Sequence, residues 1–312
     1  MKTDINAFSR LNVLVIGDLM IDEYLWGNVD RISPEAPVPV VCVNRENHTL
    51  GGAGNVINNL TAMGAGVHAV GTAGTGRAGR MILDQFRSLG LSTEGIVSEP
   101  NRPTTRKTRV IAASQQVLRI DREIRQQISG QTLDRLMTAV ESHISRMDLV
   151  ILSDYDKGLI TDELVRGVVR LAKKHQVLVL ADPKALDFSR YRSVSLLTPN
   201  QKEAGLAASM EIRSDSDLTR AALKIMEKAD LERLVITCGS QGMWLFEGDL
   251  KPVHIESRAR QVYDVSGAGD TVISLLGLGL AAGFGFEQSA RVANAAAGIV
   301  VGKVGTATAS IS

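Results

Sequence analysis

The chain has 312 residues, of which 44% are hydrophobic and 22% charged, so it has the composition of a globular protein that can bury a large core. Its formal net charge of +1 gives no indication of nucleic-acid or membrane binding, and its N-terminus lacks the apolar run of a signal peptide. The two cysteines, Cys42 and Cys238, are too far apart to suggest a disulfide framework. We therefore expect a cytoplasmic protein with no nucleic-acid partner and no membrane partner.

Short apolar runs alternate with helical patterns along the chain. Runs rich in Val, Ile and Leu, typical of strands buried on both faces, lie at 11–17, 149–153, 177–181 and 234–237. Helical patterns lie at 56–63, 80–89, 132–145, 162–174 and 217–228. This βαβ rhythm predicts a single α/β domain over residues 1–312, with a mainly parallel central sheet covered by helices.

Two segments interrupt this alternation, at about 24–44 and at about 104–121. The first carries three prolines and a Val-rich run, and the second mixes basic, apolar and polar residues, so both favour extended chain over helix. From the residues alone they could be two surface hairpins. The Val-rich run consists of Val38, Val40, Val41 and Val43. On an exposed sheet these side chains would need a cover, which favours pairing with a second copy of the chain.

The first predicted strand leads directly into two carboxylates, Asp18 and Asp22. In an open α/β sheet the carboxyl ends of strands face the ligand crevice, where a carboxylate can accept hydrogen bonds from hydroxyl groups. Gly51 and Gly52 would let the backbone approach such a ligand, and Asn55 offers both a donor and an acceptor. The residues alone also allow simpler roles, in which Asp18 caps a turn and the glycines form a flexible turn before a helix.

The segment Gly74–Gly79 fits the pattern Gly-x-Gly-x-x-Gly, follows a predicted strand at 67–71 and precedes a helix. Glu94 and Glu99 follow at about the spacing of an acidic residue that binds ribose. A dinucleotide-dependent oxidoreductase is therefore the alternative from another functional class. It would leave the motifs of the C-terminal half without a role.

The segment 264–270, with the sequence Asp-Val-Ser-Gly-Ala-Gly-Asp, precedes a long apolar run that indicates a buried helix. Gly267, Ala268 and Gly269 would place their N–H groups at the helix N-terminus, where anions bind. Asp270 would stand beside them in the first turn. Amides that stabilise a transferring phosphate, next to a carboxylate that accepts the proton of a hydroxyl, suit phosphoryl transfer. The same residues could instead be a glycine turn before an acidic residue that complements the helix dipole.

Four motifs, in the same order, resemble those of the ribokinase-like (PfkB) family of sugar kinases. They are Gly51-Gly52-Ala53-Gly54-Asn55, Asn200-Gln201-Lys202-Glu203, Thr237-Cys238-Gly239-Ser240-Gln241-Gly242 and Asp264-x-x-Gly-Ala-Gly-Asp270. The segments Asp154-Tyr155-Asp156-Lys157-Gly158 and Ala181-Asp182-Pro183-Lys184 resemble most closely the branch of D-glycero-D-manno-heptose 7-phosphate kinases. The resemblance extends from about Val13 to Gly305. It implies a ribokinase-like three-layer α/β fold with a mainly parallel central sheet and a small β lid.

This resemblance implies ATP-dependent phosphorylation of the C1 hydroxyl of D-glycero-D-manno-heptose 7-phosphate to the 1,7-bisphosphate, in heptose precursor synthesis for lipopolysaccharide. A ribokinase-like kinase for another sugar or sugar phosphate is the alternative. The implied cofactors are ATP and Mg²⁺, with a monovalent cation near Asp264 left open, and the implied assembly is a homodimer formed through the lid. The sequence lacks the His-x-Gly-His motif of the nucleotidyltransferase domain fused to some relatives, so we expect a stand-alone kinase.

The family's site residues carry over where the motifs match. The catalytic set is Asp270 as general base, with Gly267, Ala268 and Gly269 as the anion hole. The nucleotide set is Asn200, Glu203, Thr237, Gly239, Gly242, Asp264 and Asn294, with Glu203 binding Mg²⁺ through water. The sugar set is Asp22, Gly51, Gly52 and Asn55. The cations expected at the existing phosphate of the substrate are Arg109, Lys157 and Lys184, together with Arg106 and Lys107, which lie beside Arg109 on the second lid segment. By themselves, Asn200 and Glu203 could simply start a helix, Asn294 could be a buried helix residue, and cations at strand ends are usually solvated.

Overall fold

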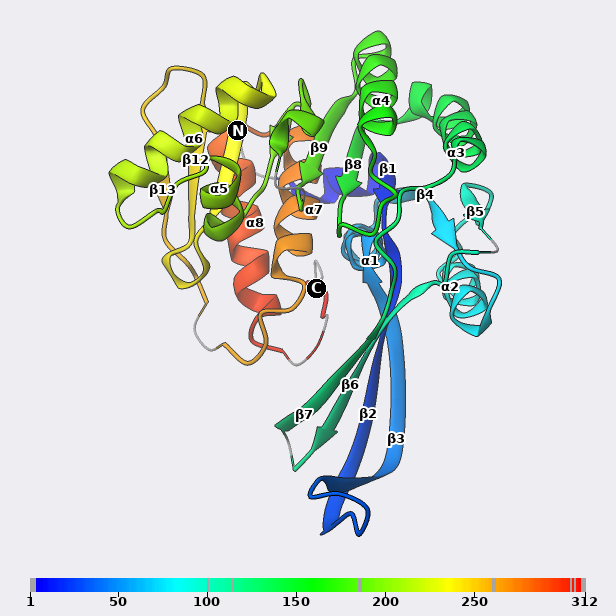
Figure 1. Ribbon diagram of the computed structural model, residues 1–312. Helices are drawn as coiled ribbons and strands as arrows, with labels where there is room; N and C mark the ends of the chain where they lie inside the picture. Colours follow the sequence, from blue (N-terminus) through cyan, green and yellow to red (C-terminus); the bar gives the residue numbers. More distant parts are fainter. Residues whose placement is uncertain are drawn as a thin grey trace.

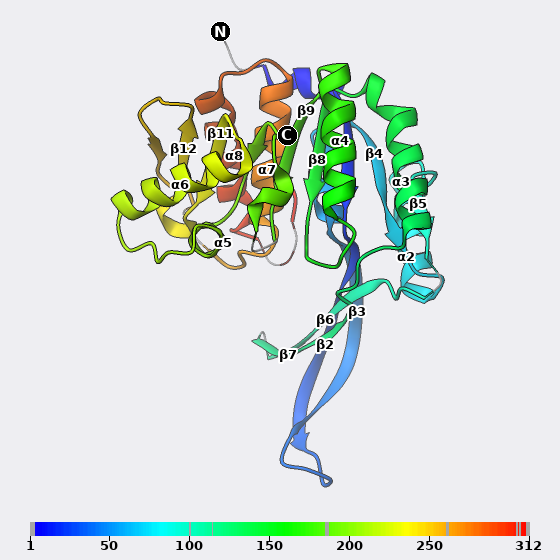
Figure 2. The same cartoon turned by 45° about the horizontal axis from the view of Figure 1, so that its top comes forward.

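The computed structural model describes residues 4–99, 101–113, 115–184, 187–259, 262–303, 305 and 307–309. Helices pack on both sides of a central sheet, and a long ribbon of strands projects from the body (Figure 1). A second view shows the same ribbon standing clear of the helices (Figure 2). The predicted α/β fold with a mainly parallel sheet is confirmed.

Nine strands form the central sheet, in the order β13-β12-β11-β10-β9-β8-β1-β4-β5. They are β1 (Asn12–Gly17), β4 (Gly66–Ala73), β5 (Ile96–Ser98), β8 (Leu149–Ser153), β9 (Leu178–Asp182), β10 (Leu196–Leu197), β11 (Arg233–Thr237), β12 (Met243–Glu247) and β13 (Val253–Ile255). Every neighbouring pair from β5 to β11 is parallel, whereas β12 and β13 add to the edge in antiparallel fashion. The strands predicted at 11–17, 149–153, 177–181 and 234–237 correspond to β1, β8, β9 and β11, and the strand predicted at 67–71 corresponds to β4.

Two hydrophobic cores lie on the two faces of this sheet. One contains side chains of α1 (Ala53–Ala62), α2 (Arg77–Ser88), α7 (Ala268–Ala281) and α8 (Phe286–Val300). The other contains side chains of α3 (Gly130–His143), α4 (Asp162–His175), α5 (Gln201–Ala207) and α6 (Asp215–Ala229). Successive residues of β1 enter opposite cores, Val13 and Val15 one and Leu14 and Ile16 the other, because side chains alternate along a strand.

Short 3₁₀ helices complete the described elements. They are η1 (Ile5–Arg10), η2 (Ile144–Arg146), η3 (Phe188–Tyr191) and η4 (Gly239–Gln241). None of the described helices has the length and apolar character needed to cross a membrane.

The projecting ribbon is a separate four-stranded sheet, which we call the lid. Its strands are β2 (Leu19–Ile32), β3 (Pro39–Gly52), β6 (Thr105–Ala112) and β7 (Gln115–Arg122), in the order β3-β2-β6-β7. Both segments that interrupt the βαβ rhythm fall in this sheet. The strands β2 and β3 extend further towards the body than the predicted segment at about 24–44. The strand β2 begins almost directly after β1, and β3 ends where α1 begins. Asp22 therefore lies on a lid strand, and apolar side chains such as Val38 (51% exposed) and Leu118 (54% exposed) stay uncovered.

The contact between α7 and the sheet depends on a glycine. A Cβ atom at Gly277 would lie 2.6 Å from a methyl carbon of Leu149 and 3.3 Å from one of Leu180. Gly277→Val should overpack this contact and lower the free energy of unfolding by about 1–3 kcal/mol, measured by urea denaturation. The control is Gly130→Ala at the start of α3, where a Cβ atom would meet open space, and it should not lower stability. Equal losses in both variants would contradict the described packing of α7.

Candidate active site

Asp270 lies where α1, α7 and the turn after β8 meet. Gly267, immediately before α7, has a φ of 83°, which glycine adopts without strain, and this turn puts Asp270 in the first turn of the helix. Asn55 Nδ2 donates to one oxygen of Asp270 at 2.7 Å, and the hydroxyl of Tyr155 donates to the other at 2.7 Å. Burial raises the pKa of Asp270 to about 6, although these two hydrogen bonds and Lys184 oppose the rise. Such a carboxylate is ionised at neutral pH and can still accept a proton.

The predicted anion hole lies next to this carboxylate. Gly267, Ala268 and Gly269 form the N-terminal end of α7, and no side chain caps that end. A Cβ atom at Gly269 would meet no atom within 4 Å. Packing within the chain therefore does not require glycine here, whereas a phosphate close to the backbone would.

A cavity of about 280 Å³ opens beside the same helix end. Its lining includes residues predicted for the nucleotide or for the anion hole, namely Thr237, Gly239, Gly242, Ala268, Gly269 and Asn294. These come from the end of β11, from η4 and the residue after it, and from the consecutive helices α7 and α8. Asn294 is fixed there because its Nδ2 donates to the backbone oxygen of Glu256 at 2.7 Å.

Asp264 is also engaged within the chain. Its Oδ1 accepts a hydrogen bond from Ser266 N at 2.9 Å, and its Oδ2 accepts one from Gly305 N at 3.1 Å. The carboxylate therefore braces the turn that precedes the anion hole. Binding of nucleotide or of a monovalent cation by Asp264 stays a prediction.

The predicted sugar-binding residues lie at the root of the lid. Asp22 on β2 is 4% exposed and accepts a hydrogen bond from Arg109 on β6. A Cβ atom at Gly51 would lie 2.3 Å from Oδ2 of Asp22, so only glycine leaves room for this carboxylate. Gly52 has a φ of 58° and forms the N-cap of α1, the helix that carries Asn55.

Asn55 connects the predicted sugar-binding residues to Asp270. Its Nδ2 donates to Asp270, whereas its Oδ1 is buried without a hydrogen-bond partner. A buried carbonyl oxygen without a donor costs free energy, so this atom is suited to accept a hydrogen bond from a ligand hydroxyl.

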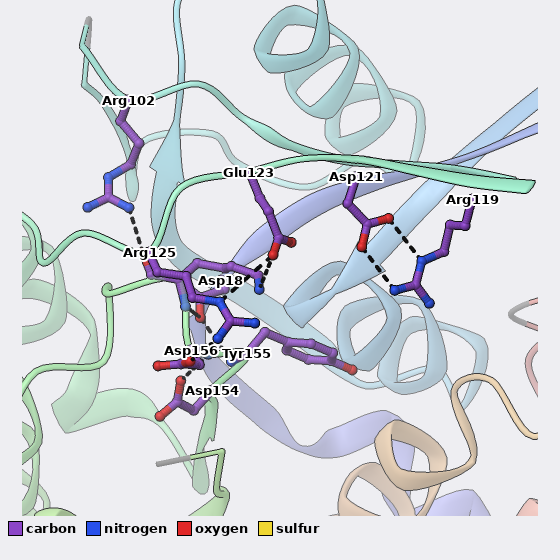
Figure 3. Close-up of polar contacts among 10 residues, drawn as sticks. Asp18, Arg102, Arg119, Asp121, Glu123, Arg125, Asp154, Tyr155 and Asp156 are labelled. Carbon is purple, nitrogen blue, oxygen red and sulfur yellow. Dashed lines mark hydrogen bonds and ion pairs between the residues drawn. The ribbon is translucent and has the colours of Figure 1, made fainter. Parts of the chain in front are cut away.

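The turn after β8 completes the site (Figure 3). Asp18, whose pKa burial raises to about 6, accepts hydrogen bonds from Tyr155 N at 2.9 Å and Lys157 N at 3.2 Å. Asp156 between them has a φ of 57°, in the left-handed region that aspartate tolerates better than most residues. Asp18 therefore holds the turn that brings the Tyr155 hydroxyl to Asp270.

Lys107 and Lys157 form a pair of cations beside Tyr155. Lys157 Nζ lies 3.0 Å from Glu123 Oε1, and Lys107 Nζ lies 5.7 Å from the centre of the Tyr155 ring. Desolvation and the charge of Lys157 lower the pKa of Lys107. The charges of Asp22, Glu123 and Asp121 act in the opposite direction. Two cations this close together favour an anionic ligand. Arg109 lies two residues along the same strand and pairs with Asp22, and its contact with a phosphate stays a prediction.

Lys184 is grouped with different residues. Its Nζ forms an ion pair with Glu203 of the nucleotide set. Desolvation would lower the pKa of Lys184, but attraction from Asp182 and Glu203 raises it overall. This differs from the predicted grouping of Lys184 with Arg109 and Lys157. The reason is topological, since Lys184 follows β9, whose neighbour β10 leads into the helix of Glu203.

Two carboxylates near Lys184 fit a hydrated divalent cation. Burial raises the pKa of Asp182 to about 8, and repulsion from Glu203 adds to the rise while Lys184 opposes it. Glu203 and Asn200 form a capping box at the start of α5, in which Asn200 N donates to one Glu203 oxygen at 2.9 Å. Mg²⁺ keeps several waters and uses one or two protein carboxylates together with phosphates, so this donor set suits it. The described residues contain no group of three or more His, Cys, Asp or Glu side chains arranged for a metal.

Three side chains of the site were not among the predicted site residues, namely Glu123, Tyr155 and Asp182. Tyr155 and Asp182 follow or end the parallel strands β8 and β9, whose carboxyl ends share an edge with that of β1. Ligands of open α/β sheets bind at the carboxyl ends of the parallel strands, so this rule could have indicated Tyr155 and Asp182 from the sequence. Glu123 has no such signal, because only the lid's position brings it near Lys157.

The comparisons with known proteins agree with this geometry. Residues 10–312 match the model of the pfkB family carbohydrate kinases. The chain is 51% identical over 305 residues to "Bifunctional protein HldE" of Desulfatibacillum aliphaticivorans, covering 98% of this chain and 62% of the relative. It is 49% identical over 300 residues to the protein of the same name in Geobacter sulfurreducens, covering 96% and 61%. The chain thus spans about three fifths of the length of these curated relatives.

Solved structures share the fold. Arabidopsis thaliana ribokinase complexed with ribose and ATP superposes with a TM-score of 0.73 at 20% identity, covering 95% of this chain and 94% of that one. Escherichia coli phosphofructokinase-2 in complex with potassium superposes with a TM-score of 0.79 at 18% identity, covering 96% of each chain.

The fold and the site therefore define a sugar kinase of the ribokinase-like type. The chain belongs to the pfkB family of carbohydrate kinases. The alternative of a dinucleotide-dependent oxidoreductase is wrong.

The raised pKa of Asp182 makes a prediction about stability. A carboxyl group with a folded pKa of about 8 and an ordinary pKa of 3.8 stabilises the fold below pH 4, and this contribution is lost as the pH rises towards 8. Asp182→Asn cannot ionise and should escape the loss. The free energy of unfolding is measured by urea denaturation without ligands. The difference between Asp182→Asn and wild type should grow in favour of the variant by on the order of 3 kcal/mol from pH 5 to pH 8. Parallel pH profiles would contradict the described burial of Asp182.

Proposed function

We propose that this chain transfers the γ-phosphate of ATP to the C1 hydroxyl of D-glycero-D-manno-heptose 7-phosphate, giving the 1,7-bisphosphate. The observation that carries the chemistry is the buried Asp270 carboxylate beside the uncapped end of α7. The choice of heptose rests on the motif resemblance and is supported by the 49–51% identity to the HldE proteins. We place the reaction in the cytoplasm, as a step towards heptose precursors of lipopolysaccharide.

Asp270 acts as the general base in this proposal. Each of its oxygens accepts one hydrogen bond within the chain, from Asn55 or Tyr155, and keeps a further lone pair for the sugar hydroxyl. The N–H groups of Gly267–Gly269 stabilise the charge on the transferring phosphate. The base and the anion hole share one helical turn, so the attacking oxygen and the phosphate are held close together.

ATP occupies the 280 Å³ cavity lined by Thr237, Gly239, Gly242 and Asn294. Asp182 and Glu203 would hold Mg²⁺, with Glu203 acting through water because one of its oxygens already caps α5. When bound, the ion neutralises charge on the triphosphate. Lys184, which lies beside both carboxylates, is placed to contact the triphosphate, and we propose this role for it in place of binding the sugar phosphate.

The sugar binds at the root of the lid. Asp22 accepts hydrogen bonds from its hydroxyl groups, and Asn55 Oδ1 gains the donor that it lacks within the chain. Gly51 and Gly52 leave room for this approach. The phosphate already on the substrate lies near Arg109, Lys157 and Lys107.

The lid also favours a homodimer. Its two edge strands, β3 and β7, have one neighbour each in the described sheet. Exposed apolar side chains on it are Val29, Ile32, Val38, Val43, Val117, Leu118 and Ile120. A second copy of the lid would cover both the edges and these side chains.

Replacement of the base tests the chemistry. Asp270→Asn keeps the shape of the side chain but cannot accept the hydroxyl proton, so kcat should fall by about 10²–10⁴ while the affinity for ATP changes little. The measurement is ADP release for kcat, together with calorimetric titration of a non-hydrolysable ATP analogue. Near-normal turnover would remove Asp270 from this role.

The substrate is tested with a panel of sugars and sugar phosphates in the same ADP-release assay. Heptose 7-phosphate should be preferred, and Lys157→Gln should raise its KM at least tenfold, because a charge-assisted hydrogen bond to phosphate is worth about 1.5–3 kcal/mol. The KM for ATP should hardly change. Lys224→Gln, on the exposed face of α6, is the control and should behave as wild type. Equal efficiency with free ribose or fructose would contradict the proposed substrate while leaving the kinase chemistry intact.

A further inference from the structure

A second cavity, of about 430 Å³, lies at the root of the lid. Its walls are the loop and first turn of α2 (Gly74–Gly79), the segment Asn101–Thr104 that leads into β6, and the side chains of Arg106 and Arg122. Arg106 precedes Lys107 on β6, so its side chain points to the opposite face of the lid from the sugar-binding residues. The cavity is therefore separate from the site around Asp270. Figures 1 and 2 both show α2 beside the body end of the lid strands.

The lining of this cavity is strongly basic. Among the described residues that line it there are four arginines and no carboxylate; the arginines are Arg77, Arg102, Arg106 and Arg122. Arg102 is fully engaged, because it binds Glu99 at 2.6 Å and the backbone oxygens of Lys157 and Gln126. Arg106 has a long ion pair of 3.8 Å with Glu23. Arg77 and Arg122 form no ion pair within the described part of the chain.

Three of these arginines occupy positions where a positive charge is electrostatically unfavourable. Arg106 lies directly opposite Arg122 in the antiparallel pairing of β6 and β7, an arrangement of like charges that destabilises a sheet. Arg77 is the first residue of α2, at the positive end of the helix dipole, and that first turn contains no acidic residue. Several like charges around one cavity lower the stability of the ligand-free chain. Such an arrangement is expected at a site that binds an anion, because binding sites are often less stable than they could be.

Gly76 keeps the cavity open. It is the N-cap of α2, a position that favours Ser, Thr, Asp or Asn, and no side chain caps this helix. Its φ of −77° is accessible to any residue, and a Cβ atom there would meet nothing within 4 Å. Neither strain nor packing requires glycine at this position. Its effect is to leave the N–H groups of the first turn of α2 without a side-chain cap at the wall of the cavity.

We propose that this cavity binds a phosphate group, held by Arg77, Arg106 and Arg122 together with the free N–H groups of α2. The bound phosphate would connect the body to two lid strands and so restrict motion of the lid. The proposal also gives a role to the Gly-x-Gly-x-x-Gly segment, which the sugar-kinase site does not use. The phosphate is a free one, because the proposed function assigns the distal phosphate of the sugar substrate to Arg109, Lys157 and Lys107 on the other face of the lid.

Direct binding tests the site without any assay of activity. Inorganic phosphate is titrated calorimetrically into the full chain saturated with Mg²⁺ and a non-hydrolysable ATP analogue, which fills the nucleotide cavity. Arg122→Gln and Arg106→Gln should each weaken phosphate binding about tenfold. Arg119→Gln is the matched control on β7, because Arg119 pairs with Asp121 at 2.9 Å and does not line the cavity, and it should bind as wild type. Equal affinity in all variants would overturn the proposal.

Gly76→Asp separates a binding role from a structural one. The new carboxylate would cap α2 and enter the cavity, so the Tm without phosphate should rise while phosphate binding is lost. A rise in Tm with unchanged phosphate affinity would overturn the proposal.

Steady-state kinetics then identify the source of the phosphate. If it is free, inorganic phosphate changes kcat in wild type without competing with the sugar phosphate, and this effect disappears in Arg122→Gln; that result supports the site. Competition with the sugar phosphate, together with a raised KM of the sugar phosphate in Arg122→Gln, would mean that the substrate's own phosphate binds here and would overturn the proposal of a free phosphate. A chain that proved inactive on heptose 7-phosphate would refute the proposed function but would leave the calorimetric result standing.

Discussion

The carboxylate of Asp270 is buried at a point that three distant parts of the chain share. Its partners Asn55 and Tyr155 lie 215 and 115 residues away in sequence, so both hydrogen bonds exist only when α1, α7 and the turn after β8 are all in place. Asp18 holds that turn through two backbone N–H groups. Because the same carboxylate adjoins the uncapped end of α7, the predicted sugar-binding residues, Asp270 and the cavity beside α7 are all positioned from one point.

Several other carboxylates crowd the same edge of the sheet. Burial raises the pKa of Asp18, Asp154 and Asp182 as well as that of Asp270, and Lys184 is the one cation that appears among the main influences on both Asp182 and Asp270. Concentrated negative charge of this kind costs stability in the ligand-free chain. It suits a site that receives a divalent cation together with a phosphate donor, because the cation supplies the positive charge that the fold itself lacks.

The lid carries charge on both of its faces, and the two faces differ. One face carries Asp22, Lys107 and Arg109 on the side of Tyr155 and Asp270. The other face carries Arg106 and Arg122, which line the cavity beside α2. A strand that alternates its side chains can therefore connect two anion-binding places through a single backbone. Any ligand that fixes one face of the lid also restricts the other, which is how the second cavity could affect the reaction.

The sequence by itself determined the α/β class, the strands β1, β8, β9 and β11 and the two lid segments, because these depend on local apolar runs, prolines and alternating patterns. Its motifs also predicted Asp270 and the glycines before it, because glycine and aspartate at a helix start have a local physical meaning. The residues around the cavity beside α7 were predicted only through their resemblance to the family's motifs. Tertiary structure alone decided that Tyr155 binds Asp270, that Lys184 pairs with Glu203 instead of joining Lys157, and that Arg106 and Arg122 face a separate cavity. These contacts follow from strand order and from the face to which each lid side chain points, and neither property is encoded in a short stretch of sequence.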